Sequence, residues 1–106
     1  MASGRLGVEG IPATTNTTVY TVPVATYTVC TVSVTNRNPT PVVIRIAMSA
    51  TGTPDDHEWI EYGTSIIANG VFERTGLVMN AGLNLVVYSD TANVCSSVYG
   101  IETSTA

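Results

Sequence analysis

The chain has 106 residues, 44% of them hydrophobic and 11% charged, with a formal net charge of −4 and no lysine. This length predicts one domain with its own core, and no apolar run approaches the roughly 18–20 residues that cross a membrane, so we expect no membrane partner. The four basic residues are arginines scattered along the chain, which predicts no nucleic-acid partner because phosphate binding requires clustered cations.

The first 16 residues are rich in Gly, Ala and Thr and show no hydrophobic periodicity. They predict an extended N-terminal arm, either a frayed terminus or a segment that orders against a neighbouring subunit. The stretch also lacks the apolar core of a secretory signal, so we expect a protein made in the cytoplasm. Residues 17–106 are predicted to form a single β-sandwich domain.

Alternating Thr and Val predict the next strands, because β-branched residues suit a pleated surface and alternation gives one wet face. Strands are expected over residues 17–22 and 27–35. A third strand is expected over Val42–Ser49, with one apolar face toward the core. The expected core face consists of Val42, Ile44, Ile46 and Met48.

Residues 53–56 (TPDD) have the pattern of a helix start, and a single turn leading into a strand at residues 59–62 is expected. Asn- and Gly-containing turns at 68–70 and 80–82 bound a strand at 71–78. Alternation at 83–88 and the run at 94–101 give two more strands. Seven or eight short strands with frequent turns predict an all-β antiparallel sandwich, either jelly-roll or Ig-like.

The densest polar cluster, residues 55–58 (DDHE), holds the only histidine, His57. Consecutive residues on a turn point in different directions, so we expect a solvated acidic loop and no metal site, with calcium binding by its carboxylates left open. No nucleophile elbow is present. We therefore expect no catalytic residues, no cofactor and no enzymatic activity.

Cys30 and Cys95 lie in strand-like runs and match no metal motif. We expect two buried small hydrophobic residues, and a disulfide is possible only where their strands pack face to face.

Several residues are candidates for contact with a partner, because Trp, Tyr and Arg are enriched at binding hot spots. Strict alternation places Trp59 and Glu61 on one face of their strand and Ile60 and Tyr62 on the other. Arg45 lies mid-strand and is expected to meet an acid from a neighbouring strand or subunit. The full set of interface candidates is Arg5, Leu6, Val8, Ile11, Arg45, Trp59, Tyr62 and Arg74.

Glu73 and Arg74 are adjacent on one predicted strand, so their side chains face opposite ways. Each is expected to find another partner, within the subunit or across an interface.

Pieces spread over nearly the whole chain resemble small virion structural proteins of tailed bacteriophages, most closely those of contractile-tailed phages of cyanobacteria. The matching pieces are residues 4–7 (GRLG), 14–23 (TTNTTVYTVP), 34–37 (VTNR), 45–47 (RIA), 58–62 (EWIEY), 70–76 (GVFERTG) and 99–102 (YGIE). The resemblance implies a non-enzymatic β-sandwich that assembles on the particle and carries no catalytic residues.

From this resemblance we expect a capsid decoration or cement protein on the outer surface of the virion, made in the host cytoplasm. Its expected partners are the major capsid protein or other virion proteins, and we expect a homo-oligomer, with a trimer as the working guess. The alternative is a neck, tail or fibre module that binds a glycan or receptor.

Overall fold

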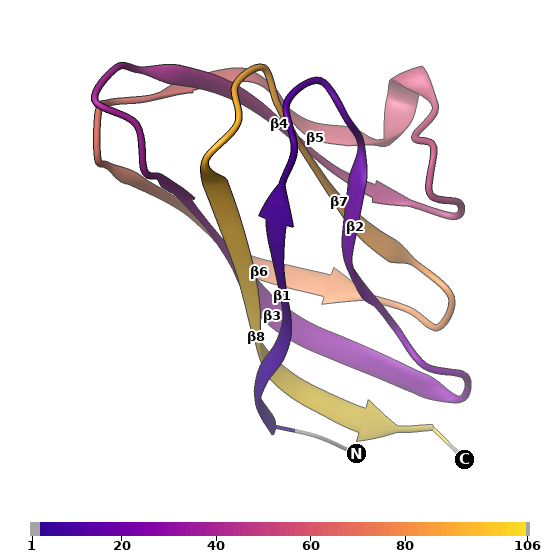
Figure 1. Ribbon diagram of the computed structural model, residues 1–106. Coiled ribbons are helices and arrows are strands. Elements are labelled where there is room, and N and C mark those ends of the chain that lie inside the picture. The colour runs from indigo at the N-terminus through magenta and orange to yellow at the C-terminus, as the bar shows by residue number, and fades with distance from the viewer. Residues whose placement is uncertain (1–2, 106) are drawn as a thin grey trace.

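Two four-stranded sheets pack against each other in the computed structural model, which describes residues 3–105 (Figure 1). Sheet I has the order β1-β8-β3-β6, and sheet II has the order β2-β7-β4-β5. The strands are β1 (Ser3–Ile11), β2 (Thr17–Thr21), β3 (Thr26–Asn36), β4 (Val42–Ser49), β5 (Trp59–Ile66), β6 (Val71–Met79), β7 (Asn84–Ser89) and β8 (Val94–Ser104). The predicted all-β antiparallel sandwich is confirmed.

Strands from the first half of the chain pair with strands from the second half in reverse order. β1 pairs with β8, β2 with β7, β3 with β6 and β4 with β5, all antiparallel, and the pairs β3·β8 and β4·β7 join these ribbons into the two sheets. Of the connections between consecutive strands, only the one from β4 to β5 stays within one sheet. The remaining connections cross between the sheets and so wrap around a shared core.

Thr/Val alternation sets the inner face of β3, where Cys30, Val32 and Val34 are buried, while Val29 is exposed. On β4 the predicted Val42, Ile44 and Ile46 are all buried. Met48 is only partly buried, and Ala47 is buried instead of exposed. Met48 still packs against the core, and Ala47 lies outside the core cluster, so β4 keeps its alternation. The register with β7 is unbroken, and the irregularity beside Ala47 adds its extra residue to β5.

A short 3₁₀ helix, η1 (Asp56–Glu58), leads directly into β5 at Trp59. This is the single turn before a strand that the sequence predicts. No helix within residues 3–105 is long and apolar enough to cross a bilayer.

The segment expected to be an arm forms a strand of the sandwich where the structure describes it. Residues 3–11 are β1 and pair along β8 from Ser3 opposite Ile101 to Ile11 opposite Val94, and residues 1 and 2 lie outside the described part. Glycine here serves close packing, because a Cβ on Gly7 would come 2.2 Å from the Val19 carbonyl oxygen of β2. Gly7 therefore lets β1 approach β2 of the opposite sheet.

One buried asparagine ties together three loops at one end of the sandwich. The amide nitrogen of Asn36 donates to the carbonyl oxygens of Thr40 at 2.9 Å and Ile67 at 3.0 Å. Its amide oxygen accepts from the amide nitrogen of Asn38 at 3.0 Å, which also donates to the Ala92 carbonyl at 2.8 Å. Asn36 is fully buried, so these bonds replace the water that the loop carbonyls would otherwise bind.

We expect Asn36→Ala to lower the free energy of unfolding by about 3 kcal/mol or more, because it leaves several buried carbonyls and an amide without partners. Denaturant unfolding measures this change. The matched control is Asn80→Ala, at an exposed turn position, for which we expect a change within about 0.5 kcal/mol. Equal stabilities of the two variants would contradict the role given to Asn36.

Candidate functional site

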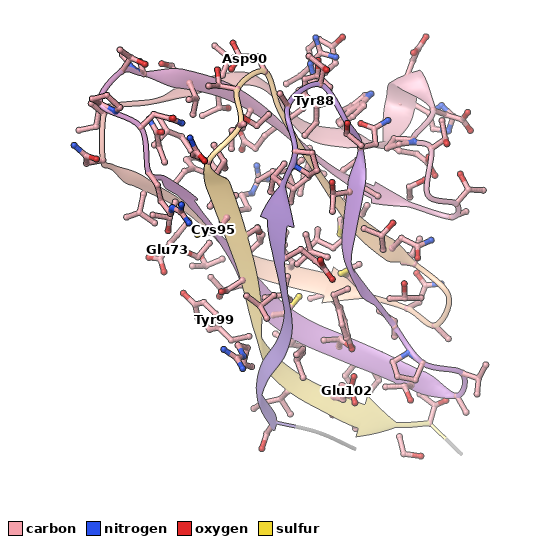
Figure 2. The ribbon with its side chains drawn as sticks, viewed as in Figure 1. Glu73, Tyr88, Asp90, Cys95, Tyr99 and Glu102 are labelled. Atoms are coloured by element: carbon pink, nitrogen blue, oxygen red, sulfur yellow. The ribbon has the colours of Figure 1, made fainter. Side chains whose placement is uncertain are left out.

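A cation stacked between two tyrosines dominates the outer face of sheet II. The β-ladder places Arg45 of β4 directly between Tyr62 of β5 and Tyr88 of β7. Its guanidinium carbon lies 4.2 Å from the ring centroid of Tyr62 and 4.8 Å from that of Tyr88, which is labelled in Figure 2. Each such contact is worth about 0.5–1 kcal/mol at an exposed site. Arg45 therefore stacks on two rings, in place of the acid that the sequence predicted.

Trp59 and Tyr62 face the same side, contrary to strict alternation. In the register with β4, Trp59 lies opposite Ala47 and Tyr62 opposite Arg45, and the irregularity between them adds one residue to β5. The two rings meet edge to face, with centroids 5.6 Å apart and planes at 70°. The prediction that put Tyr62 with Ile60 was wrong because local sequence does not reveal a bulge.

An open pocket of about 470 Å³ lies beside this ring pair and is lined by Asp56, Trp59 and Tyr62. Its lining offers one carboxylate, an indole N–H, a phenol hydroxyl and two aromatic faces. Within residues 3–105, no group of three or more His, Cys, Asp or Glu side chains converges in a way that could hold a metal ion. The chemistry of the pocket is that of binding an amphipathic ligand.

Glu58 orders the acidic loop that places Asp56 and Trp59. Its carboxylate accepts hydrogen bonds from the backbone N–H of Asp55 at 2.8 Å and of Ala50 at 3.1 Å, and from the Ser49 hydroxyl at 2.8 Å. These donors, the Asp55 backbone first, lower the pKa of Glu58 below its ordinary value. The acidic loop, which we expected to be solvated, is held in place by hydrogen bonds to the Glu58 carboxylate.

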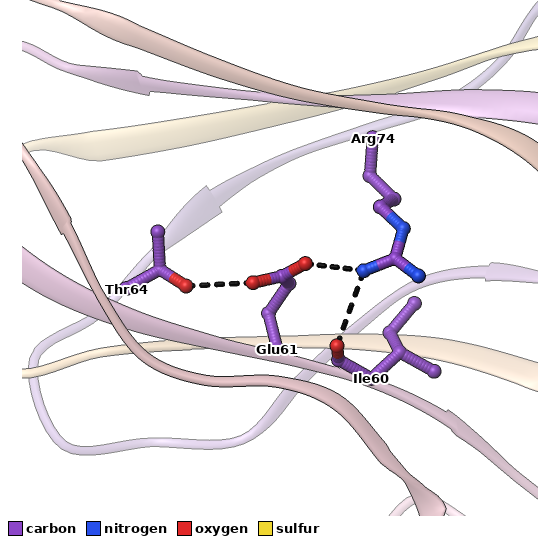
Figure 3. Close-up of polar contacts among 4 residues, drawn as sticks. All are labelled: Ile60, Glu61, Thr64 and Arg74. Carbon is purple, nitrogen blue, oxygen red and sulfur yellow. Dashed lines mark hydrogen bonds and ion pairs between the residues drawn. The ribbon is translucent and has the colours of Figure 1, made fainter.

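Arg74 finds its partner inside the chain (Figure 3). Arg74 of β6 forms an ion pair with Glu61 of β5, so the pair links an edge strand of sheet I to an edge strand of sheet II. The same guanidinium nitrogen donates to the Ile60 carbonyl at 3.2 Å, and the Thr64 hydroxyl donates to Glu61 at 2.7 Å. Arg74 was expected to pair either within the subunit or across an interface, and the structure shows a partner within the subunit.

The outer face of sheet I carries an exposed apolar row. Val29 of β3 lies opposite Ile101 of β8 and Val78 of β6, so the three side chains stand side by side across three strands. Their exposed fractions are 45%, 60% and 64%. On the same outward side, the Tyr99 hydroxyl donates to the Glu73 carboxylate, a bond that raises the pKa of Tyr99 (Figure 2).

The predicted interface residues fall in different places. Arg45, Trp59 and Tyr62 lie together on the outer face of sheet II, and Arg5 and Val8 are exposed on β1. Leu6 is partly buried against the core, and Ile11 is 3% exposed within it. Both pack inward because β1 belongs to the sandwich.

Sequence reasoning missed Val29, Val78 and Ile101 as surface candidates. One signal was available for Val29: it is out of phase with Val32 and Val34 on its own strand, so an alternating strand must turn it outward.

Both cysteines are free thiols. They lie on neighbouring strands of the same sheet, with Cys30 opposite Gly100 and Cys95 opposite Thr35, so the face-to-face packing that a disulfide requires is absent for this pair. Cys30 is buried, its sulfur lies 3.9 Å from that of Met79, and burial raises the pKa of its thiol to about 11. It behaves as a core residue.

Comparisons with protein-family models, with curated proteins and with solved structures gave no match.

We expect the loop around Glu58 to loosen in acid. Because the folded-state pKa lies below the ordinary value of 4.5, the stabilisation is complete above that pH and is lost as the pH falls through the folded-state pKa. Trp59 is the only tryptophan, and its fluorescence reports the change between about pH 6 and about pH 2.

Glu58→Gln should give the acid-type Trp59 signal already at neutral pH and remove the transition. The control Glu9→Gln changes an exposed carboxylate on β1 and should titrate like the wild type. An unchanged transition in Glu58→Gln would refute the role of this carboxylate.

Proposed function

We propose that this chain is a structural protein of a phage virion, and specifically a capsid decoration protein that binds the outer shell. Two observations support the proposal: the resemblance of its sequence pieces to small virion proteins of tailed phages, and the exposed apolar row on sheet I. The second carries the proposal, because exposed apolar side chains aligned across three strands are typical of a surface that is buried in an assembly.

We also propose that the sandwich is a jelly roll. Strands that pair first with last and that are distributed between two four-stranded sheets support this identity. An immunoglobulin fold has a different order, with its first strand beside its second, whereas β1 here lies beside β8. Jelly rolls are among the folds found in viral capsids.

The docking face is the outward side of sheet I, centred on Val29, Val78 and Ile101. Its central strands β3 and β8 present only uncharged side chains outward, mostly Thr and Ser beside the apolar row. The charged residues Arg5 and Glu73 lie on the edge strands β1 and β6. An apolar centre with a charged rim is the ordinary anatomy of a protein interface.

The proposed occupant is a flat, weakly charged patch on neighbouring shell subunits. Burial of the apolar row supplies free energy at about 25 cal/mol per Å², and an interface of about 1,600 Å² is enough for specific binding. Contact with two adjacent subunits at once holds them together, and repetition over the shell adds avidity. The mechanism needs no chemical step, which agrees with the expectation of a non-enzyme.

The double variant Val29→Glu/Val78→Glu should bind capsids at least about tenfold more weakly, because docking then buries two unpaired carboxylates. Co-sedimentation with capsids that lack this protein measures binding, and circular dichroism verifies the fold.

Val24→Glu is the matched control, since Val24 is 88% exposed but lies between β2 and β3, outside the docking face. We expect it to bind like the wild type. Normal capsid occupancy by the double variant would refute the docking face. A double variant that loses only self-association would assign the face to a second copy of this chain instead.

A further inference from the structure

The pocket on sheet II has polar groups with no hydrogen-bond partner in the part of the chain that the structure describes. Among the hydrogen bonds of residues 3–105, none involves the Asp56 carboxylate, the Trp59 indole N–H or the Tyr62 hydroxyl. Tyr62 is 64% exposed, and its ring stands at 70° to that of Trp59. Two aromatic faces and three hydrogen-bonding groups therefore border one open space.

This lining matches the chemistry of a sugar ring. A pyranose has apolar C–H groups on its face and hydroxyls around its rim, and C–H groups are attracted to the negative face of an aromatic ring. A carboxylate accepts hydrogen bonds from hydroxyls, and the indole N–H donates to a hydroxyl or ring oxygen. The pocket volume of about 470 Å³ falls within the usual range for small-molecule sites.

The charges around the pocket favour a neutral ligand. Asp56 repels phosphates, uronates and other anions. A quaternary ammonium group, the usual cation for aromatic walls, meets the positive charge of Arg45, which already lies 4.2 Å from the centre of the Tyr62 ring. A neutral sugar has no net charge for either group to repel.

The walls are fixed before any ligand arrives. The irregularity in β5 sets the ring pair, the Arg45 guanidinium stacks on the Tyr62 ring, and the hydrogen bonds of Glu58 hold the loop that carries Asp56. Binding therefore costs little ordering of side chains, which favours affinity in a shallow site.

We propose that Asp56, Trp59 and Tyr62 form a binding site for a neutral saccharide. The site lies on sheet II, opposite the docking face on sheet I, so a particle-bound copy presents it outward. The saccharide site does not depend on the docking proposal, since it needs only the folded chain.

The test uses the full chain and the methyl glycosides of glucose, galactose, mannose and N-acetylglucosamine. We expect at least one of them to shift the NMR signal of the Trp59 indole N–H in a saturable way. The dissociation constant should stay unchanged between about 0.05 and about 0.5 M salt, because screening acts only on charged ligands. Tyr62→Ala should raise it at least about tenfold.

Tyr27→Ala is the matched control, an exposed aromatic on sheet I whose loss should leave the dissociation constant unchanged. The variant Val29→Glu/Val78→Glu should also bind the sugar normally, which separates this test from that of docking. No shift with any of the four glycosides at about 50 mM overturns the proposal. A shift with choline chloride but with none of the glycosides also overturns the proposal, because it would indicate a cation site.

Discussion

The ladder between β3 and β8 is the constraint from which the rest of the molecule follows. Its strands run antiparallel over their full eleven residues, from Thr26 opposite Ser104 to Asn36 opposite Val94, without a shift of register. β1 pairs with the other edge of β8, and β6 pairs with the other edge of β3, which completes sheet I. Because side chains alternate across a pleated strand, the register that buries Val32 and Val98 must turn Val29 outward. The apolar row on sheet I is therefore a geometric consequence of the core.

The pocket on sheet II arises in the opposite way, from a break in regular pairing. A regular β5 would put Trp59 and Tyr62 on opposite faces, because they are three residues apart. The added residue between them brings both rings outward and turns Glu61 to the sandwich edge, where it meets Arg74. One irregularity thus places the aromatic walls of the pocket and an ion pair between the two sheets.

Features that depend only on neighbouring residues could be predicted from the sequence. The bounds of β4, its inner residues Val42, Ile44 and Ile46, and the turn before β5 could all be derived from alternation and capping residues. The strand β1 could not, because Gly7 is there to let β1 approach β2, a contact with the other sheet that no local rule identifies. The stacking of Arg45 on two tyrosines depends on cross-strand register, which is set by pairing between residues distant in sequence.

The two outer faces differ in chemistry because they differ in regularity. The centre of sheet I is a continuous ladder that presents only uncharged side chains outward, and such a surface gains most by covering a flat partner. Sheet II is interrupted beside η1, and the Trp59 and Tyr62 rings form a recess with the Asp56 carboxylate that suits a small polar ligand. A sandwich that binds a shell with one sheet must point the other away from it. Under the proposed docking, the recess on sheet II is then the part of the protein that meets the surroundings of the particle.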